Sequence, residues 1–216
     1  MSFKLAIFIA SIIGTTAIGS DFQKNKSQVK KANDKETPTN LIIPDTAGQL
    51  MNENEFWKLI ENSRVAAKNR YTEQISALKT LLVKLENKEI EKFNNRFTAL
   101  LVVSYDWKLW GAAYVINGGC SDDCFDYFRQ YLIRHGKNRF YQTIKDPESC
   151  AGWIKSEEQE GWEGLQYCAM DAYKQKTGKE LPKSYNPKFE LKGKPFDEET
   201  VSKQYPKLSK KFMNGG

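Results

Sequence analysis

Apolar residues recur at the three- and four-residue spacing of amphipathic helices from about residue 52 onward. Asn52 is expected to cap the first helix, with Glu55 as its capping-box partner. Thr72 is expected to cap a second helix, and a third starts at about Lys88. Because no alternating pattern of apolar and polar residues indicates a strand in this region, the sequence predicts an all-α fold.

The segment Trp107–Ile116 is apolar nearly all round, so it is expected to form a buried helix. The glycine pair at 118–119 should end this helix, because glycine adopts left-handed turn conformations without steric cost. Ser121 then starts another helix. The first turn of that helix carries Asp122 and Asp123, where negative charge complements the helix dipole.

The remaining helices are expected closer to the C-terminus. Asp146 is expected to cap a short helix with Pro147 in its first turn. A longer helix is expected within 157–176, and Gly178 should close it. The sequence therefore predicts a single compact multi-helix domain, with about six to eight helices over residues 51–213.

The N-terminus has the order of a secretory signal peptide: Lys4, an uncharged apolar run over 5–13, then small residues up to Ser20. A small-x-small cleavage site at 17–19 would make residues 1–19 the signal. The apolar run is shorter than the roughly 20 residues of a spanning helix, although a retained anchor is the alternative. We expect an exported protein, periplasmic or secreted, with no stable membrane span after cleavage.

Residues 20–50 are polar and lysine-rich, which predicts a disordered tether. The formal net charge of +6 belongs to the ends of the chain. Residues 20–37 hold five lysines against three acidic residues, and residues 183–216 hold eight against four. Since 51–182 is formally neutral and nucleic-acid binders cluster their basic residues on one face, nucleic acid is not an expected partner.

A motif over residues 107–129, WKLWGAAYVINGGCSDDCFDYFR, resembles a bacterial family of domains of unknown function numbered 4240 (DUF 4240). Segments at 56–61, 146–149, 180–182, 193–199 and 205–208 also resemble the family, so the resemblance covers about 51–212. It implies a helical domain with no assigned activity, whose C-terminal segment packs as part of the domain. Cys120 fits the motif, whereas the other three cysteines and the signal peptide depart from it.

The four cysteines allow two disulfides in an exported chain, in any of three connectivities. Cys120 and Cys124 lie close together across a helix start, and Cys150 and Cys168 lie on neighbouring expected helices. This pairing is the preferred one, since a bridge needs Cα atoms roughly 4.4–6.8 Å apart. The alternative is four buried thiols, because free cysteine packs as a small apolar residue.

Cysteine catalysis and metal binding both have weak support. Cys120 lies at a helix N-terminus, which can lower a thiol pKa. However, His135, the one histidine, lies roughly 20 Å further along the same helix. A set made of Cys120, Asp122, Asp123 and Cys124 is an unusual zinc site without a spaced second pair. No metal or cofactor is expected, and the simpler interpretation is that the aspartates cap the helix and one reaches Arg129.

Two functional hypotheses remain. In the first, a non-enzymatic module binds a protein or small ligand at the corner between Asn117 and Arg129, beside a set of aromatic residues. The alternative for these aromatic residues is that they simply form part of the core. The candidate binding residues are Trp107, Trp110, Asn117, Asp122, Asp123 and Arg129. In the second, an enzyme uses Asp122 and Asp123 as an acid–base pair. Because no known catalytic or phosphate-binding motif is present, the sequence favours binding.

Overall fold

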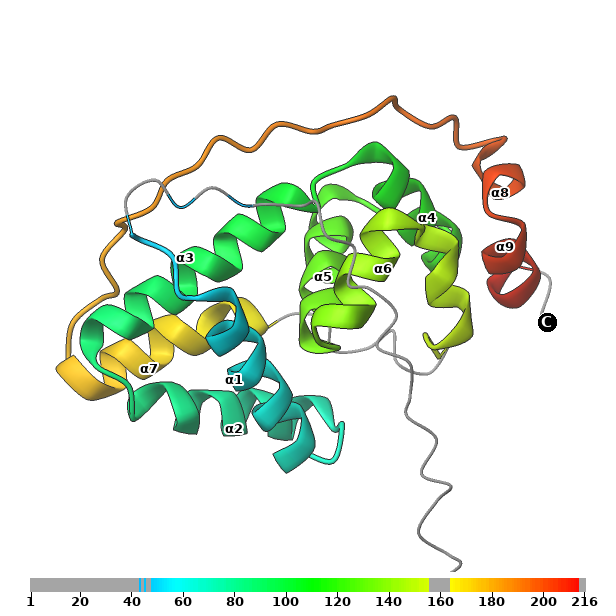
Figure 1. Ribbon diagram of the computed structural model, residues 1–216. Helices are drawn as coiled ribbons and strands as arrows, with labels where there is room; N and C mark the ends of the chain where they lie inside the picture. The colour runs from blue at the N-terminus through cyan, green and yellow to red at the C-terminus, as the bar shows by residue number, and fades with distance from the viewer. Residues whose placement is uncertain (1–42, 44, 46–47, 156–163, 214–216) are drawn as a thin grey trace, which may run out of the picture. The chain divides into compact units, whose positions relative to one another are not determined.

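Helices form the regular secondary structure of the residues that the computed structural model describes: 43, 45, 48–155 and 164–213 (Figure 1). The α-helices are α1 (Glu53–Ala66), α2 (Tyr71–Val83), α3 (Asn87–Val103), α4 (Trp107–Asn117), α5 (Asp122–Arg134), α6 (Lys137–Lys145), α7 (Cys168–Thr177), α8 (Val201–Gln204) and α9 (Pro206–Phe212). Two 3-10 helices are η1 (Pro147–Gly152) and η3 (Leu165–Tyr167). Eight of these α-helices have seven residues or more and the described residues form no strand, so the predicted all-α fold is confirmed.

All described residues belong to one compact unit. The expected signal peptide over 1–19 and most of the expected tether over 20–50 lie outside the described residues. Within the described ranges, no helix combines the length and apolar character needed to cross a bilayer.

Local sequence explains several helix starts. The Asn52 side chain accepts from the N–H groups of the second and third residues of α1, and Ser121 caps α5 by accepting from the Cys124 N–H. The prediction that Thr72 caps the second helix is wrong, since α2 begins at Tyr71 and contains it. The reason is a tight turn: Lys68 and Asn69 both take positive φ angles, 50° and 63°, and the chain returns to helix directly afterwards.

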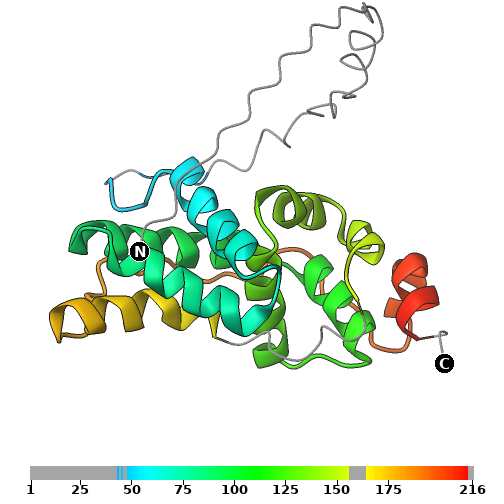
Figure 2. The same ribbon diagram turned by 90° about the horizontal axis from the view of Figure 1, so that it is seen from below.

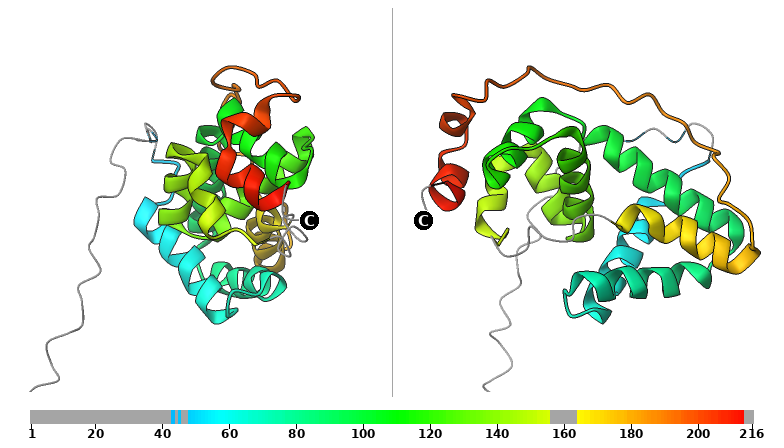
Figure 3. Two further views of the ribbon diagram at one scale, coloured as in Figure 1. Left: turned by 90° about the vertical axis from the view of Figure 1, so that its right-hand side faces the viewer. Right: turned by 180° about the vertical axis from the view of Figure 1, so that it is seen from behind.

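Helix α5 lies between two groups of helices. On one side, α2 packs against α1 and α7, and α3 also packs against α7. On the other side, α4 packs against α9 and η1, and α6 packs against η1. Figures 1 and 2 and the right-hand view of Figure 3 show these groups side by side. Contacts of α5 with α1, α3, α4 and α6 join them, and its Phe125, Phe128, Tyr131 and Leu132 side chains are fully buried.

The C-terminal helices pack onto α4. An extended segment over 179–200 leads from α7 to α8, and its Lys192 pairs with Asp106 through a single parallel β-bridge (Figure 1). Tyr205 is buried and donates its hydroxyl to the Lys108 carbonyl over 2.7 Å. This approach depends on Gly111, because a Cβ there would lie 3.0 Å from the Tyr205 Oη. The C-terminal helices are therefore part of the packed domain.

Candidate functional site

The expectation that the Trp107–Ile116 helix is buried all round is wrong for one face of α4. Trp107, Trp110, Tyr114 and Asn117 follow one another at helical spacing and are all half-buried. The two indole rings stack with centroids 5.0 Å apart and an angle of 11° between their planes. Trp110 then stacks on Phe125 of α5 at 4.9 Å and 13°. The result is a continuous aromatic stack that runs from partly exposed rings to a buried one.

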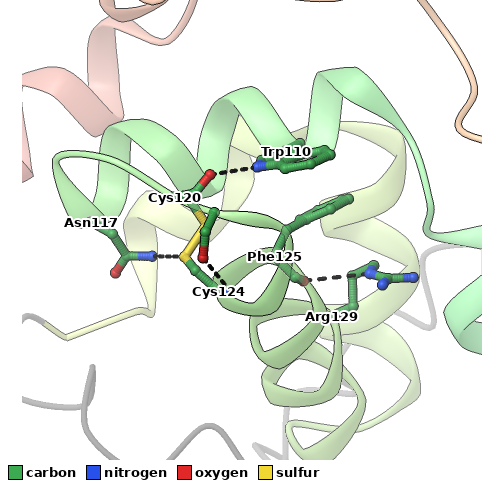
Figure 4. The surroundings of a disulfide bond; sticks show 7 residues. Trp110, Asn117, Cys120, Cys124, Phe125 and Arg129 are labelled. Carbon is green, nitrogen blue, oxygen red and sulfur yellow. Dashed lines mark hydrogen bonds between the residues drawn. A yellow bond between two sulfur atoms is a disulfide. The ribbon is translucent and has the colours of Figure 1, made fainter.

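A disulfide holds the turn that links α4 to α5 (Figure 4). Gly118 ends α4 with φ 66°, and the predicted Cys120–Cys124 bridge is present, with Cα atoms 5.3 Å apart. The Trp110 Nε1–H donates to the Cys120 carbonyl over 2.9 Å, and the Asn117 amide donates to Cys124 Sγ over 3.3 Å (Figure 4). The turn is therefore tied both to the stack and to α4.

We call this surface the disulfide corner. It comprises Trp107, Trp110, Asn117, Cys120, Asp122, Asp123 and Cys124. All of them are half-buried or exposed. The ring stack, the hydrogen bonds of Trp110 and Asn117 and the disulfide connect α4 to the turn that carries Asp122 and Asp123, whereas Arg129 is buried.

Arg129 lies beneath the disulfide corner and has a structural position. The residue is 4% exposed, and its guanidinium donates to the Leu101 carbonyl over 2.7 Å and to Asp126 Oδ1 over 2.7 Å. The guanidinium carbon lies 4.8 Å from the ring centroid of Tyr105 and 4.9 Å from that of Phe125. Burial lowers the Arg129 pKa, against the opposing effect of the Asp126 charge. The expected contact with Asp122 or Asp123 is therefore wrong, because Asp126 takes that role.

Asp122 and Asp123 are exposed in the first turn of α5. Consecutive residues of an α-helix point about 100° apart, since the helix has 3.6 residues per turn. Their carboxylates therefore diverge rather than share a site. Their position complements the positive end of the α5 dipole, which accounts for a stabilising role.

The second predicted bridge, between Cys150 and Cys168, is wrong, because both thiols are free and buried. Cys150 Sγ donates to the Pro147 carbonyl over 2.9 Å, whereas Cys168 Sγ lies 3.8 Å from the Ile75 carbonyl. Burial raises the pKa of each thiol to about 12. Two protonated, enclosed thiols and one disulfide leave no thiolate nucleophile among the four cysteines.

The family resemblance implied that the C-terminal segment packs on the domain, but the sequence did not predict its contacts with the aromatic residues of α4. Phe196 packs edge-on against Trp107 with centroids 5.7 Å apart and contacts Tyr114 at 5.4 Å. The Tyr114 hydroxyl donates to Glu198 over 2.9 Å, and this hydrogen bond is the main reason that the Tyr114 pKa is raised. No local signal predicts these contacts, since they join positions more than eighty residues apart.

No group of three or more His, Cys, Asp or Glu side chains in the described ranges is arranged to hold a metal ion. The fold and the disulfide corner thus define an all-α domain with an aromatic surface. The chain belongs to the family described as "Protein of unknown function (DUF4240)", whose sequence profile matches residues 51–175. This match ends within α7, so it is shorter than the resemblance over 51–212. No curated protein and no solved structure matches the chain.

Proposed function

We propose that this protein is an exported, non-enzymatic binding module whose recognition surface is the disulfide corner. The observation that carries the proposal is the half-exposed stack of Trp107 and Trp110, bonded to a disulfide-closed turn that carries the exposed residues Asp122 and Asp123. Stacked indoles offer a large contact area at a low cost in conformational entropy. The hydrogen bond from Trp110 to the Cys120 carbonyl restrains one of these rings before any partner arrives.

The charge of the disulfide corner indicates the chemistry of its partner. Asp122 and Asp123 present negative charge at its edge, and their two side chains are exposed. Opposite charge across an interface steers association and selects among partners. We therefore infer a partner with a positive charge beside an apolar group, either a segment of a protein or a small ligand.

The enzymatic alternative has less support than binding. A pair of carboxylates needs to share one site before their pKa values separate into an acid and a base. Asp122 and Asp123 diverge from adjacent positions on the helix surface and remain exposed. Arg129, the nearby basic candidate, is already bonded to Leu101 and Asp126.

A selection experiment tests the binding proposal. A random peptide library displayed on phage is selected against the mature protein and against the triple variant W107A/D122N/D123N. We expect peptides enriched in lysine and arginine from the wild-type protein only. The control variant D171N/E180Q also removes two exposed carboxylates, one within α7 and one just after it, and should select like the wild type. Equal enrichment by the triple variant, with its circular dichroism spectrum unchanged, would contradict the proposal.

The export part of the proposal has its own test. The N-terminal sequence supports export, and a disulfide on a half-buried turn suits an oxidising compartment. We expect the protein in the extracytoplasmic fraction of its cell, with a mature N-terminus at Ser20. Recovery of the full-length chain from the cytoplasmic fraction would contradict it.

A further inference from the structure

A second surface feature lies at the other end of α5, where α5 turns into α6 against α1. It is a cavity of about 410 Å³. Its lining residues are Trp57, Glu61, Arg64, His135, Gly136, Lys137, Asn138 and Arg139. None of them belongs to the disulfide corner. Small-molecule sites begin at about this volume.

The cavity lining has an excess of positive charge. It contains three cationic side chains, Arg64, Lys137 and Arg139, against the single carboxylate of Glu61. Two of the cations have carboxylate partners: Arg64 binds both oxygens of Glu61, at 3.0 and 2.6 Å, and Lys137 Nζ lies 3.2 Å from Glu53 Oε1. The third cation, Arg139, has no carboxylate within ion-pair distance in the described part of the chain.

The surroundings of Arg139 orient its guanidinium without neutralising it. Its Nη1 lies 3.0 Å from His135 Nδ1, and its guanidinium carbon lies 4.9 Å from the Trp153 ring centroid. Because a guanidinium can only donate, Nδ1 must accept and the imidazole is neutral with its hydrogen on Nε2. The nitrogens Nε and Nη2 of Arg139 make no hydrogen bond to any other described residue.

His135 lies in the positive potential that these arginines create in the cavity. Burial, together with the charges of Arg134, Arg139 and Arg64, lowers its pKa to about 2. The imidazole thus lies in a region where three arginines make an added positive charge unfavourable. The same potential favours a negative charge. The first turn of α6 has no side-chain cap, so its N–H groups and the positive end of the helix dipole also favour a negative charge.

We propose that this cavity binds a small anion through a carboxylate or phosphate group, with Arg139 as the principal contact. Arg139 offers two donors in a planar fork, which suits two oxygens of one anionic group. Arg64 is the second contact. Glu61 is an internal competitor, because its carboxylate already holds Arg64 and is 48% exposed, so it can move aside when an anion enters.

The competition between Glu61 and an added anion makes the proposal sharply testable. Removal of Arg139 should weaken anion binding, whereas removal of the Glu61 charge should strengthen it. A residue with only a structural role would not produce effects of opposite sign. A charge-assisted hydrogen bond contributes enough for R139Q to weaken binding about tenfold. E61Q should strengthen binding by about threefold to tenfold, because it removes a like charge near the site.

The experiment titrates the mature protein with inorganic phosphate and, separately, with acetate, at ionic strength held constant with chloride. The readout is NMR chemical shift at the Trp57 indole N–H and the backbone amides of 136–139. We expect saturable shifts with a dissociation constant on the order of 1–10 mM. The control K79Q removes a cation from α2 that is paired with Asp171, and it should change affinity by less than about twofold.

The outcomes separate clearly. Binding of both probes indicates a general anion site, and binding of one identifies the group that the cavity prefers. The proposal is overturned if neither probe gives saturable shifts, or if E61Q leaves affinity unchanged or weakens it. Since E61Q alters an exposed side chain, that arm decides the matter even if R139Q fails to fold. Unchanged affinity in the W107A/D122N/D123N variant would show that this cavity is independent of the disulfide corner.

Discussion

Replacement of Arg129 by methionine tests whether this residue is part of the scaffold. In the structure its guanidinium donates to the Leu101 carbonyl, one of the last four carbonyls of α3. A side chain of α5 therefore supplies a hydrogen-bond donor to a carbonyl at the C-terminal end of α3, where helical partners run out. A positive charge at that end also complements the α3 dipole. Methionine keeps much of the aliphatic packing of arginine and loses the charge and the donors.

The contacts set the expected magnitude. Loss of a charged donor to Leu101 costs about 1–3 kcal/mol. Loss of the two cation–π contacts with Tyr105 and Phe125 adds about 0.5–2 kcal/mol each. Part of this loss in free energy is offset, because methionine avoids the cost of desolvating a buried guanidinium. We therefore expect R129M to lower the free energy of unfolding by about 2–4 kcal/mol. The free energy of unfolding of R129K should lie between those of the wild type and R129M, since lysine keeps the charge but lacks the planar fork of donors.

The assay is urea unfolding followed by tryptophan fluorescence, with the midpoint compared at constant slope. The matched control is D126N, which removes the partner charge of Arg129. Because the Asp126 side chain is 32% exposed and remains hydrated, this variant should cost about 1 kcal/mol or less. If R129M costs less than D126N, the helix-capping role of Arg129 is refuted. Normal stability of R129M would also reopen Arg129 as a residue for ligand binding.

Two further predictions concern α4 and the α5–α6 turn. G111A should destabilise the protein by about 1–3 kcal/mol despite the better helix propensity of alanine, because its Cβ meets the Tyr205 hydroxyl. The penalty should shrink in a Y205A background, as measured by a double-mutant cycle, and an unchanged penalty would contradict this cause. His135 has a folded pKa of about 2, below its ordinary 6.5, so its contribution to stability is full above pH 6.5 and is lost as the pH falls towards 2. Urea midpoints between pH 7 and 4 should fall less steeply in H135N, and an imidazole NMR titration near pH 6.5 would refute the prediction.

The parts of the fold that the sequence predicts are those decided by nearby residues. Asn52 and Ser121 cap helices through bonds to N–H groups two or three residues away, and Gly118 ends α4 in the left-handed conformation that glycine tolerates. The Cys120–Cys124 bridge is similarly local. Thr72 was mispredicted because the two positive φ angles before α2 arise at Lys and Asn, which carry no turn signal as strong as glycine.

The candidate site shows where this local reasoning ends. The helical rule that pairs residues three or four apart identifies Asp126, not Asp122 or Asp123, as the partner of Arg129, and the structure agrees. Exposure of Trp107 and Trp110 could not be predicted, because an apolar helix gives no sign of which face its neighbours leave uncovered. The cavity at His135 depends on how α1 meets the α5–α6 turn. Contacts between such distant segments have no signature in a single sequence.

Helix electrostatics separates the two surfaces that we propose as sites. Asp122 and Asp123 lie at the positive end of the α5 dipole, so stability alone is a sufficient reason for their charge. The opposite holds at the cavity. Lys137 and Arg139 occupy the first turn of α6, where positive charge is unfavourable and no acidic residue of α6 offsets it. Lys137 is paired with Glu53 of α1, whereas Arg139 has no carboxylate partner among the described residues. A bound anion therefore explains the position of Arg139 better than stability does, and the cavity is the stronger of the two candidates for direct test.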